Sequence, residues 1–156
     1  MRQIQIYENA DILCGELAEA LPIPASISEP IHIALSGGST PTLLFEKMTA
    51  VDDPDAFMNT HFYWVDERHV PEDDPESNYA VFRRLLVDTG IVSAENVHPI
   101  KYHPDIHQMT ANYEQELRKH VPFEGGYPLF DEIVLGVGED GHTASIFPDR
   151  LDLFET

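Results

Sequence analysis

The sequence predicts an α/β protein in which helices cover both faces of a mainly parallel sheet, a three-layer α/β/α arrangement. Two observations support this class. Short apolar runs, typical of buried strands, alternate along the chain with stretches whose apolar residues recur at helical spacing. Clusters of Gly and Pro separate these segments, as turns do. At 156 residues the chain has the length of one domain with a sizeable core.

The N-terminal residues are expected to form a strand, a helix and a loop. A short strand at residues 4–7 precedes a helix over about residues 9–21. Cys14 lies on the leucine-rich stripe of that helix, which favours a buried structural thiol. As the only cysteine it has no partner for an internal disulfide. Residues 22–30 contain three prolines and are predicted to be a loop.

Two further strands and a helix are expected in the next part of the chain. The compact apolar run of residues 31–35 predicts a strand. Thr40 then offers an N-cap for a helix, and Pro41 stands where a helix start tolerates its missing N–H. A third strand is expected at residues 61–65, followed by an acidic loop.

The remaining elements alternate in the same way. Ser77 is expected to cap a helix, and a short strand follows around residues 97–100. Asp105 and Gln108 have the spacing of a capping box at the start of another helix. Residues 132–137 are expected to form a strand, and their Ile, Val and Leu residues are continuous enough for burial on both faces.

The charge balance excludes several classes of partner. Asp and Glu number 28 against 9 Lys and Arg, which gives a formal net charge of −19. We therefore expect no unspecific binding to nucleic acid and none to an anionic membrane surface. No apolar run is long enough for a membrane span, and the start lacks the pattern of a signal peptide, so we expect a cytoplasmic protein. An anionic substrate must be held by local donors.

The first candidate site motif is Leu-Ser-Gly-Gly-Ser-Thr-Pro at residues 35–41, between a predicted strand and a predicted helix. Gly37 and Gly38 allow the backbone to approach a ligand closely, and N–H groups of the helix start point toward it. Hydroxyl donors are supplied by Ser36, Ser39 and Thr40. The motif therefore indicates a cradle for phosphate or carboxylate, although a tight strand–helix turn with a Thr cap explains it too.

The second motif lies at residues 64–71, at the carboxyl end of a predicted strand, where open α/β sheets bind their ligands. Asp66, Glu67 and Arg68 stand in a row there. They offer a carboxylate that can orient a partner and a fixed cation for an anionic group. The simpler interpretation is a solvated charged loop.

The third motif spans residues 135–148 and again follows a predicted strand. Gly136, Gly138 and Gly141 bend the chain, and His142 stands where a new helix is expected to begin. Imidazole takes and returns a proton near neutral pH. Glu139 and Asp140 both lie close enough in sequence to hold the ring or raise its pKa. A structural role for this histidine is the alternative.

A metal site is not expected. His98, His103 and His107 are loosely spaced, and the proline and predicted helix cap between them make convergence on one ion unfavourable. A serine hydrolase is not expected either, because the chain lacks a Gly-x-Ser-x-Gly elbow.

Taken together and in order, the three motifs resemble 6-phosphogluconolactonase, in the superfamily that also contains glucosamine-6-phosphate deaminase. Ser-Gly-Gly-Ser-Thr-Pro at residues 36–41 is similar to the whole superfamily. Asp-Glu-Arg at 66–68 and Gly-Glu-Asp-Gly-His-Thr-Ala-Ser at 138–145 resemble the lactonase branch. The deaminase branch usually has Asp-Glu-Tyr at the first of these places and an Asn-Glu-Pro sequence near the second. The resemblance covers essentially the whole chain.

This resemblance implies a Rossmann-like sheet in a single domain, residues 1–156, that lacks the C-terminal third of the family's length. It implies hydrolysis of 6-phospho-D-glucono-1,5-lactone to 6-phosphogluconate in the oxidative pentose phosphate pathway, with no metal or organic cofactor. His142 would be the general base, and Asp66 would orient that ring or the attacking water. Substrate and its phosphate would be bound by Ser36, Gly37, Gly38, Ser39, Thr40, Arg68, Gly138, Asp140 and Gly141.

The oxyanion is expected to be stabilised by N–H groups of residues 138–142. The expected partner is a small sugar phosphate, and the expected assembly is a monomer or weak homo-oligomer. Two alternatives stay open: an enzyme resembling glucosamine-6-phosphate deaminase or isomerase, and a non-catalytic domain that only binds a sugar phosphate.

Overall fold

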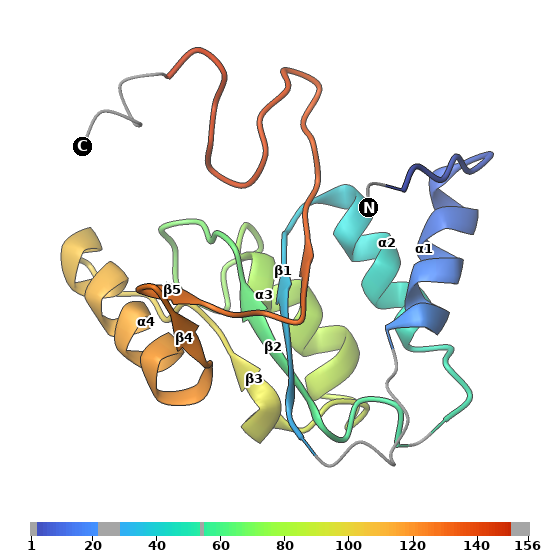
Figure 1. Ribbon diagram of the computed structural model, residues 1–156, viewed down its shortest axis with the longest axis horizontal. Coiled ribbons are helices and arrows are strands. Elements are labelled where there is room, and N and C mark those ends of the chain that lie inside the picture. The colour runs from blue at the N-terminus through green and yellow to red at the C-terminus, as the bar shows by residue number, and fades with distance from the viewer. Residues whose placement is uncertain (1–2, 22–28, 54, 151–156) are drawn as a thin grey trace.

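Four parallel strands form the sheet at the centre of the computed structural model, which describes residues 3–21, 29–53 and 55–150. Their order across the sheet is β3-β2-β1-β6 (Figure 1). The bounds are Ile31–Leu35 for β1, Thr60–Trp64 for β2, Val97–His98 for β3 and Glu132–Val134 for β6. Strand β1 pairs with both β2 and β6, so that Leu35 lies between Trp64 and Val134. The loops that follow these three strands therefore leave the sheet at the same edge.

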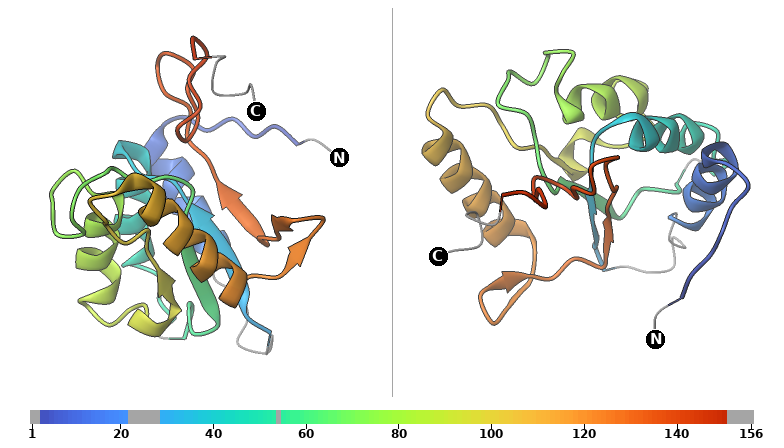
Figure 2. Two further views of the ribbon diagram at one scale, coloured as in Figure 1. Left: turned by 90° about the vertical axis from the view of Figure 1, so that its left-hand side faces the viewer. Right: turned by 90° about the horizontal axis from the view of Figure 1, so that it is seen from above.

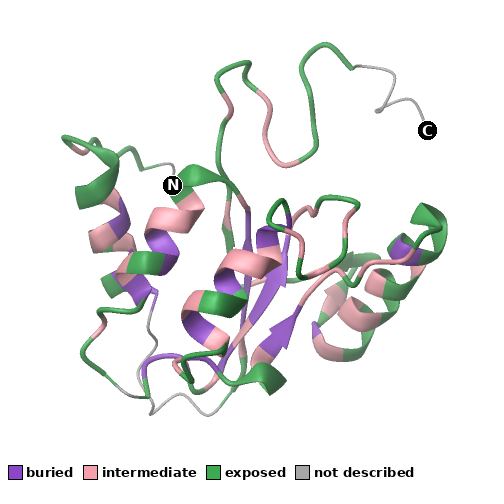
Figure 3. Ribbon diagram, turned by 180° about the vertical axis from the view of Figure 1, so that it is seen from behind, coloured by how far each residue is buried: buried purple, intermediate pink, exposed green. Residues whose placement is uncertain are grey.

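Helices cover both faces of this sheet (Figure 2). They are α1 (Ala10–Ala20), α2 (Ser39–Met48), α3 (Asn78–Phe82) and α4 (Ile106–His120), with a π-helical turn η1 (Arg83–Val87) and a 3₁₀ turn η2 (Ala94–Asn96). Ile33 and Phe62 face the larger core, which α1, α2 and α3 complete. Ala34 and Tyr63 point the other way and pack beneath the end of α4. The expected α/β class and parallel sheet are confirmed, and Figure 3 shows the buried strands between the helices.

Several of the predicted local signals are confirmed. Cys14 is buried, with 1% of its surface exposed, and its thiol faces the Thr40 carbonyl oxygen at 3.6 Å. Ser77 caps α3, because its hydroxyl accepts a hydrogen bond from the N–H of Ala80 at 3.2 Å. The strand predicted at residues 31–35 is β1 with the same bounds.

Two of the predicted helix starts are wrong in detail. Helix α2 begins at Ser39 with Gly38 as its N-cap residue, so Thr40 lies inside the first turn and does not cap it. Asp105 caps α4 through the N–H of His107 at 2.9 Å, but Gln108 does not reach back to complete a capping box. Its side-chain amide instead donates to Asn112 at 2.7 Å, one turn along the helix.

The two ends of the described chain also differ from expectation. Residues 3–7 form no strand, and Ile4 and Ile6 are 78% and 93% exposed, because no strand of the described sheet pairs with this segment. Strand β6 is shorter than the 132–137 predicted, and it is not buried on both faces: Ile133 is 53% exposed. It pairs with β1 on one side only, which leaves its apolar side chains near solvent.

Smaller differences concern strand bounds and the proline-rich segment. Strand β2 lies one residue earlier than predicted, and β3 is two residues long, not four. Most of the predicted loop at 22–30 lies outside the described residues. A two-stranded hairpin of β4 (Phe123–Glu124) and β5 (Tyr127–Pro128) lies between α4 and β6. None of the described helices combines the length and apolarity needed to cross a bilayer.

Candidate functional site

The loops that follow β1, β2 and β6 enclose one cleft of about 680 Å³ at the carboxyl edge of the sheet. In Figure 1 the segment after β6 rises above this edge as the red trace. The cleft is lined by most of the residues singled out from the sequence: Ser36, Gly37, Gly38, Ser39, Thr40, Asp66, Arg68, Gly138 and His142. Asp140 and Gly141 belong to the same turn as His142 but do not line the cleft. The three motifs are thus brought together.

The first loop presents the start of α2 to the cleft. No side chain of the described residues caps this helix. The N–H groups of Ser39 and Thr40 belong to its first turn, where helical N–H groups have no partner within the helix and carry partial positive charge. Ser36 is different, since its hydroxyl already donates to the Val134 carbonyl at 3.1 Å. The helix start is therefore the part of this loop that can bind an anion.

Gly37 makes this loop lie close to the start of α3. A Cβ atom on Gly37 would be 1.8 Å from Oδ1 of Asn78, a distance that no side chain tolerates. The amide of Asn78 in turn donates to Oδ1 of Asp66 at 3.3 Å. Asn78 thus connects the first loop to the second. Asn78 belongs to none of the three motifs, although it directly follows the predicted cap Ser77.

In the second loop, Glu67 has a structural role that the sequence analysis did not assign. Its carboxylate accepts the N–H groups of Asn78 at 2.7 Å and of Tyr79 at 2.9 Å. It also accepts the hydroxyl of Ser77 at 3.0 Å. Glu67 is therefore tied to the first turn of α3, and this holds its neighbours Asp66 and Arg68 at the mouth of the cleft.

Asp66 and Arg68 differ in how they are held. The carboxylate of Asp66 accepts the hydroxyl of Ser145 at 3.2 Å, so it connects the second loop to the third. The structure shows no hydrogen bond between Asp66 and His142. Arg68 is exposed, and its guanidinium makes no ion pair within the described part of the chain. A cation without a carboxylate partner at the wall of a cleft is available to an anionic ligand.

His142 is held by Asp140. Nδ1 of His142 lies 2.5 Å from Oδ1 of Asp140, and the ring stacks on Phe147 with 4.9 Å between centroids. The hydrogen bond from His142 lowers the pKa of the Asp140 carboxyl. Because a carboxylate only accepts, a neutral His142 has its hydrogen on Nδ1. Its Nε2 then carries the free electron pair that a base requires.

The turn around His142 is tight and is not followed by the expected helix. A Cβ atom on Gly138 would lie 2.3 Å from the His142 ring, so only glycine permits this approach. The N–H of Gly138 donates to the His142 carbonyl at 2.8 Å, and that of Gly141 donates to the Gly138 carbonyl at 2.9 Å. These two N–H groups, expected to stabilise an oxyanion, are used within the turn itself.

The histidines considered for a metal do not converge as a group. Nδ1 of His103 lies 3.2 Å from the Asp105 carbonyl oxygen, and His107 is exposed. His98 instead lies beside Glu116 and His120, on the face of the sheet that α4 covers. This group is away from the cleft.

Comparison with known proteins gives a consistent result. The chain is 43% identical over 148 residues to a 6-phosphogluconolactonase of Haemophilus influenzae, an alignment that covers 92% of the chain and 61% of that relative. Its fold matches the 6-phosphogluconolactonase of Trypanosoma brucei with a TM-score of 0.81 at 28% identity, covering 100% of the chain and 67% of that structure. The fold also matches the 6-phosphogluconolactonase of Thermotoga maritima with a TM-score of 0.70 at 30% identity, covering 88% of the chain and 59% of that structure.

The chain therefore spans about 61% of the length of the curated relative from Haemophilus. A profile of the family described as glucosamine-6-phosphate isomerases/6-phosphogluconolactonase matches residues 8–156, almost the full length of the chain. The resemblance based on the three motifs is thus confirmed at the level of the family. With this match, and with a sheet and cleft that place those motifs together, the chain belongs to the glucosamine-6-phosphate isomerase/6-phosphogluconolactonase family.

Proposed function

We propose that this chain carries the catalytic cleft of a 6-phosphogluconolactonase, which hydrolyses 6-phospho-D-glucono-1,5-lactone to 6-phosphogluconate in the pentose phosphate pathway. One observation carries the proposal. His142, with Nδ1 paired to Asp140, lines the same cleft as the start of α2 and as Arg68, whose guanidinium has no ion-pair partner among residues 3–21, 29–53 and 55–150. A base and an anion site within one cleft are what hydrolysis of a phosphorylated lactone requires.

The phosphate group is assigned to the start of α2 and to Arg68. The N–H groups and hydroxyls of Ser39 and Thr40 supply neutral donors, and the guanidinium supplies charge. Hydrogen bonds to charged groups are worth about 1.5–3 kcal/mol each. A few of them outweigh the diffuse repulsion from a chain of net charge −19.

In the proposed mechanism, Nε2 of His142 takes a proton from water while the water oxygen attacks the lactone carbonyl carbon. The carbonyl oxygen then carries the negative charge until the bond between that carbon and the ring oxygen breaks. The imidazolium returns its proton to the departing ring oxygen, which leaves an open-chain acid. Proton transfer of this kind contributes about 10²–10⁴-fold to the rate.

Asp66 and Asp140 have different parts in this scheme. Asp140 keeps the hydrogen of His142 on Nδ1 and stabilises the imidazolium as it forms. Asp66, which bonds Asn78 and Ser145, is left to position the attacking water. None of these steps uses a metal ion or an organic cofactor. We further propose that the protein acts in the cytoplasm as a monomer or weak homo-oligomer.

The test is turnover of the lactone, with an enzyme-free blank subtracted because the lactone also opens spontaneously. We expect the chain to accelerate formation of 6-phosphogluconate and His142→Ala to lose most of that acceleration. His107→Ala, which changes an exposed histidine on α4, is the matched control and should keep it. A near-normal kcat in His142→Ala would remove this residue as the base.

The same preparation separates the two alternative functions. Release of ammonia from glucosamine 6-phosphate would identify a deaminase instead. A rise in Tm with 6-phosphogluconate, together with no turnover of the lactone, would identify a domain that only binds sugar phosphates.

A further inference from the structure

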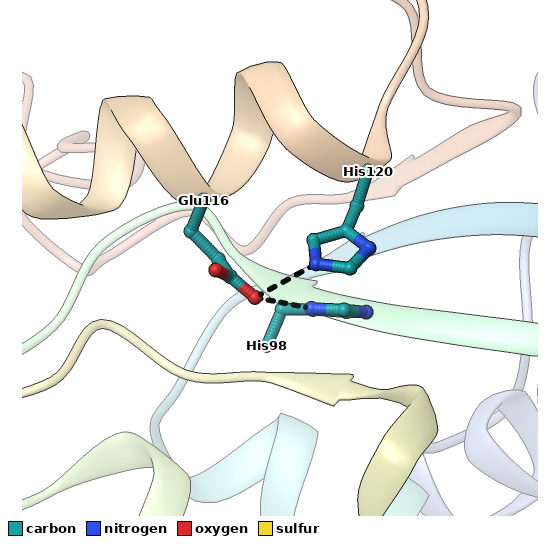
Figure 4. A group of neighbouring side chains, drawn as sticks. All are labelled: His98, Glu116 and His120. Atoms are coloured by element: carbon teal, nitrogen blue, oxygen red, sulfur yellow. Dashed lines mark hydrogen bonds and ion pairs between the residues drawn. The ribbon is translucent and has the colours of Figure 1, made fainter.

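We propose that His98, Glu116 and His120 form a binding site for a divalent transition-metal ion, with Zn²⁺ as the preferred ion, outside the candidate catalytic cleft. Nδ1 of His98 lies 2.8 Å from Oε1 of Glu116, and Nε2 of His120 lies 3.3 Å from the same oxygen. One potential ligand atom from each residue lies within 4.8 Å of the other two. Figure 4 shows the carboxylate of Glu116 facing both imidazole rings.

These separations match the needs of a tetrahedral ion. Zinc binds histidine nitrogen and carboxylate oxygen at about 2.0–2.2 Å, so two of its ligands lie about 3.3 Å apart. The observed 2.8 and 3.3 Å are close to this value, and the three ligand atoms lie within 4.8 Å of one another, so side-chain rotation would bring them onto one ion. Glu116 and His120 stand four residues apart on one face of α4, while His98 comes from β3. An ion would therefore join the helix to the sheet.

His98 also has the support that metal-binding histidines usually have. Its second ring nitrogen, Nε2, lies 2.9 Å from Nδ1 of His61. When Nδ1 of His61 carries no hydrogen, it can accept a hydrogen bond from Nε2–H of His98. That bond would leave the electron pair of His98 Nδ1 directed at the ion.

Charge and access favour a cation as well. The site offers one negative and two neutral ligands, and Lys119 is the nearby charge that opposes a cation. His98 is 4% exposed, but the side chains of His120 and Glu116 are 29% and 38% exposed, which gives an ion a route in. Water would complete the coordination.

The proposal is tested by titrating the 156-residue chain with Co²⁺, followed by absorption spectroscopy, and with Zn²⁺, followed by calorimetry. We expect one tight ion per chain and the visible absorption bands of tetrahedral Co²⁺. Mutating a residue that only hydrogen-bonds to a metal ligand typically weakens metal binding 10–100-fold. His120→Gln removes a ligand itself, so it should weaken Zn²⁺ binding at least about 100-fold. His107→Gln, the same change at an exposed position of α4, should leave it unchanged.

Two more variants show where the ion binds and whether weaker binding results from a change in the fold. Glu116→Gln should weaken Zn²⁺ binding as His120→Gln does, with the far-ultraviolet circular dichroism of both variants unchanged. His142→Gln should keep the site, because the cleft is separate. In ¹⁵N spectra, Zn²⁺ should move the hydrogen of His98 from Nδ1 to Nε2. The proposal would be overturned by equal affinity in all variants or by loss of binding in His142→Gln. It would also be overturned if neither ion binds, and His98, Glu116 and His120 would then form only a hydrogen-bond network.

Discussion

Glu67→Gln is expected to lower the free energy of unfolding by about 2–4 kcal/mol relative to a matched surface change. In the structure, Oε2 of Glu67 accepts the N–H of Tyr79 at 2.9 Å and the hydroxyl of Ser77 at 3.0 Å, while Oε1 accepts the N–H of Asn78 at 2.7 Å. Glutamine replaces one of these oxygens by an NH₂ group, so at least one N–H loses its acceptor. A lost hydrogen bond to a charged group is worth about 1.5–3 kcal/mol, and an unsatisfied donor adds to the loss.

The assay is urea unfolding followed by the fluorescence of Trp64, the only tryptophan, which is buried against Tyr79. Glu76→Gln is the matched control, because it removes the same charge from an exposed residue next to Ser77. It therefore corrects for the repulsion that any lost carboxylate relieves in a chain of net charge −19. A difference under about 0.5 kcal/mol between the two variants, within the range of ordinary surface changes, would refute the structural role assigned to Glu67.

Three other changes test the cleft and the histidine cluster. Gly138→Ala should reduce lactone turnover about 10²-fold with little change in Tm, because the added Cβ displaces the His142 ring. Wild-type turnover of this variant in a steady-state assay would contradict the prediction. Arg68→Ala should raise KM about tenfold or more with kcat and Tm nearly unchanged. The Tm is not expected to change because the guanidinium has no carboxylate partner in the described part of the chain. An unchanged KM would assign the phosphate to the start of α2 alone. The contribution of His61 to stability should fall by at most about 3 kcal/mol as pH drops from 6.5 toward 4, because burial first and neighbouring histidines next hold its pKa at about 4 in the folded chain. In urea unfolding, His61→Gln should lack this part of the pH dependence.

Local patterns were sufficient to predict the elements that the core needs. The run of residues 31–35 is buried from both sides of the sheet, so its apolar composition and its structure agree. The same reasoning is wrong for residues 132–137, where the composition is equally apolar but Ile133 is 53% exposed. Burial of a strand depends on its neighbours in space, and β6 has only β1 beside it in the described sheet. An apolar pattern cannot specify how many neighbours a strand has.

The meeting of the three motifs was predictable for a related reason, because each follows a strand of one parallel sheet. The contacts within the motifs were less predictable. Asp66, expected to orient His142 or the water, bonds Ser145, while Asp140 holds the ring. Residue type and spacing showed that carboxylates stand near the histidine. They did not show which carboxylate has the direct contact, since that depends on the path of the turn at Gly138.

The relative placement of the three loops depends on residues at the start of α3 that lie outside all three motifs. Asn78 is 8% exposed, its N–H is fixed by Glu67, and its side-chain amide bonds Asp66. Gly37 can approach only because it lacks the Cβ that would collide with this side chain. Asp66 in turn connects to the third loop, because its carboxylate accepts the hydroxyl of Ser145. The relative position of the first loop and the turn at His142 therefore depends on these contacts through Asn78. The geometry of the cleft thus depends on the stability of the first turn of α3.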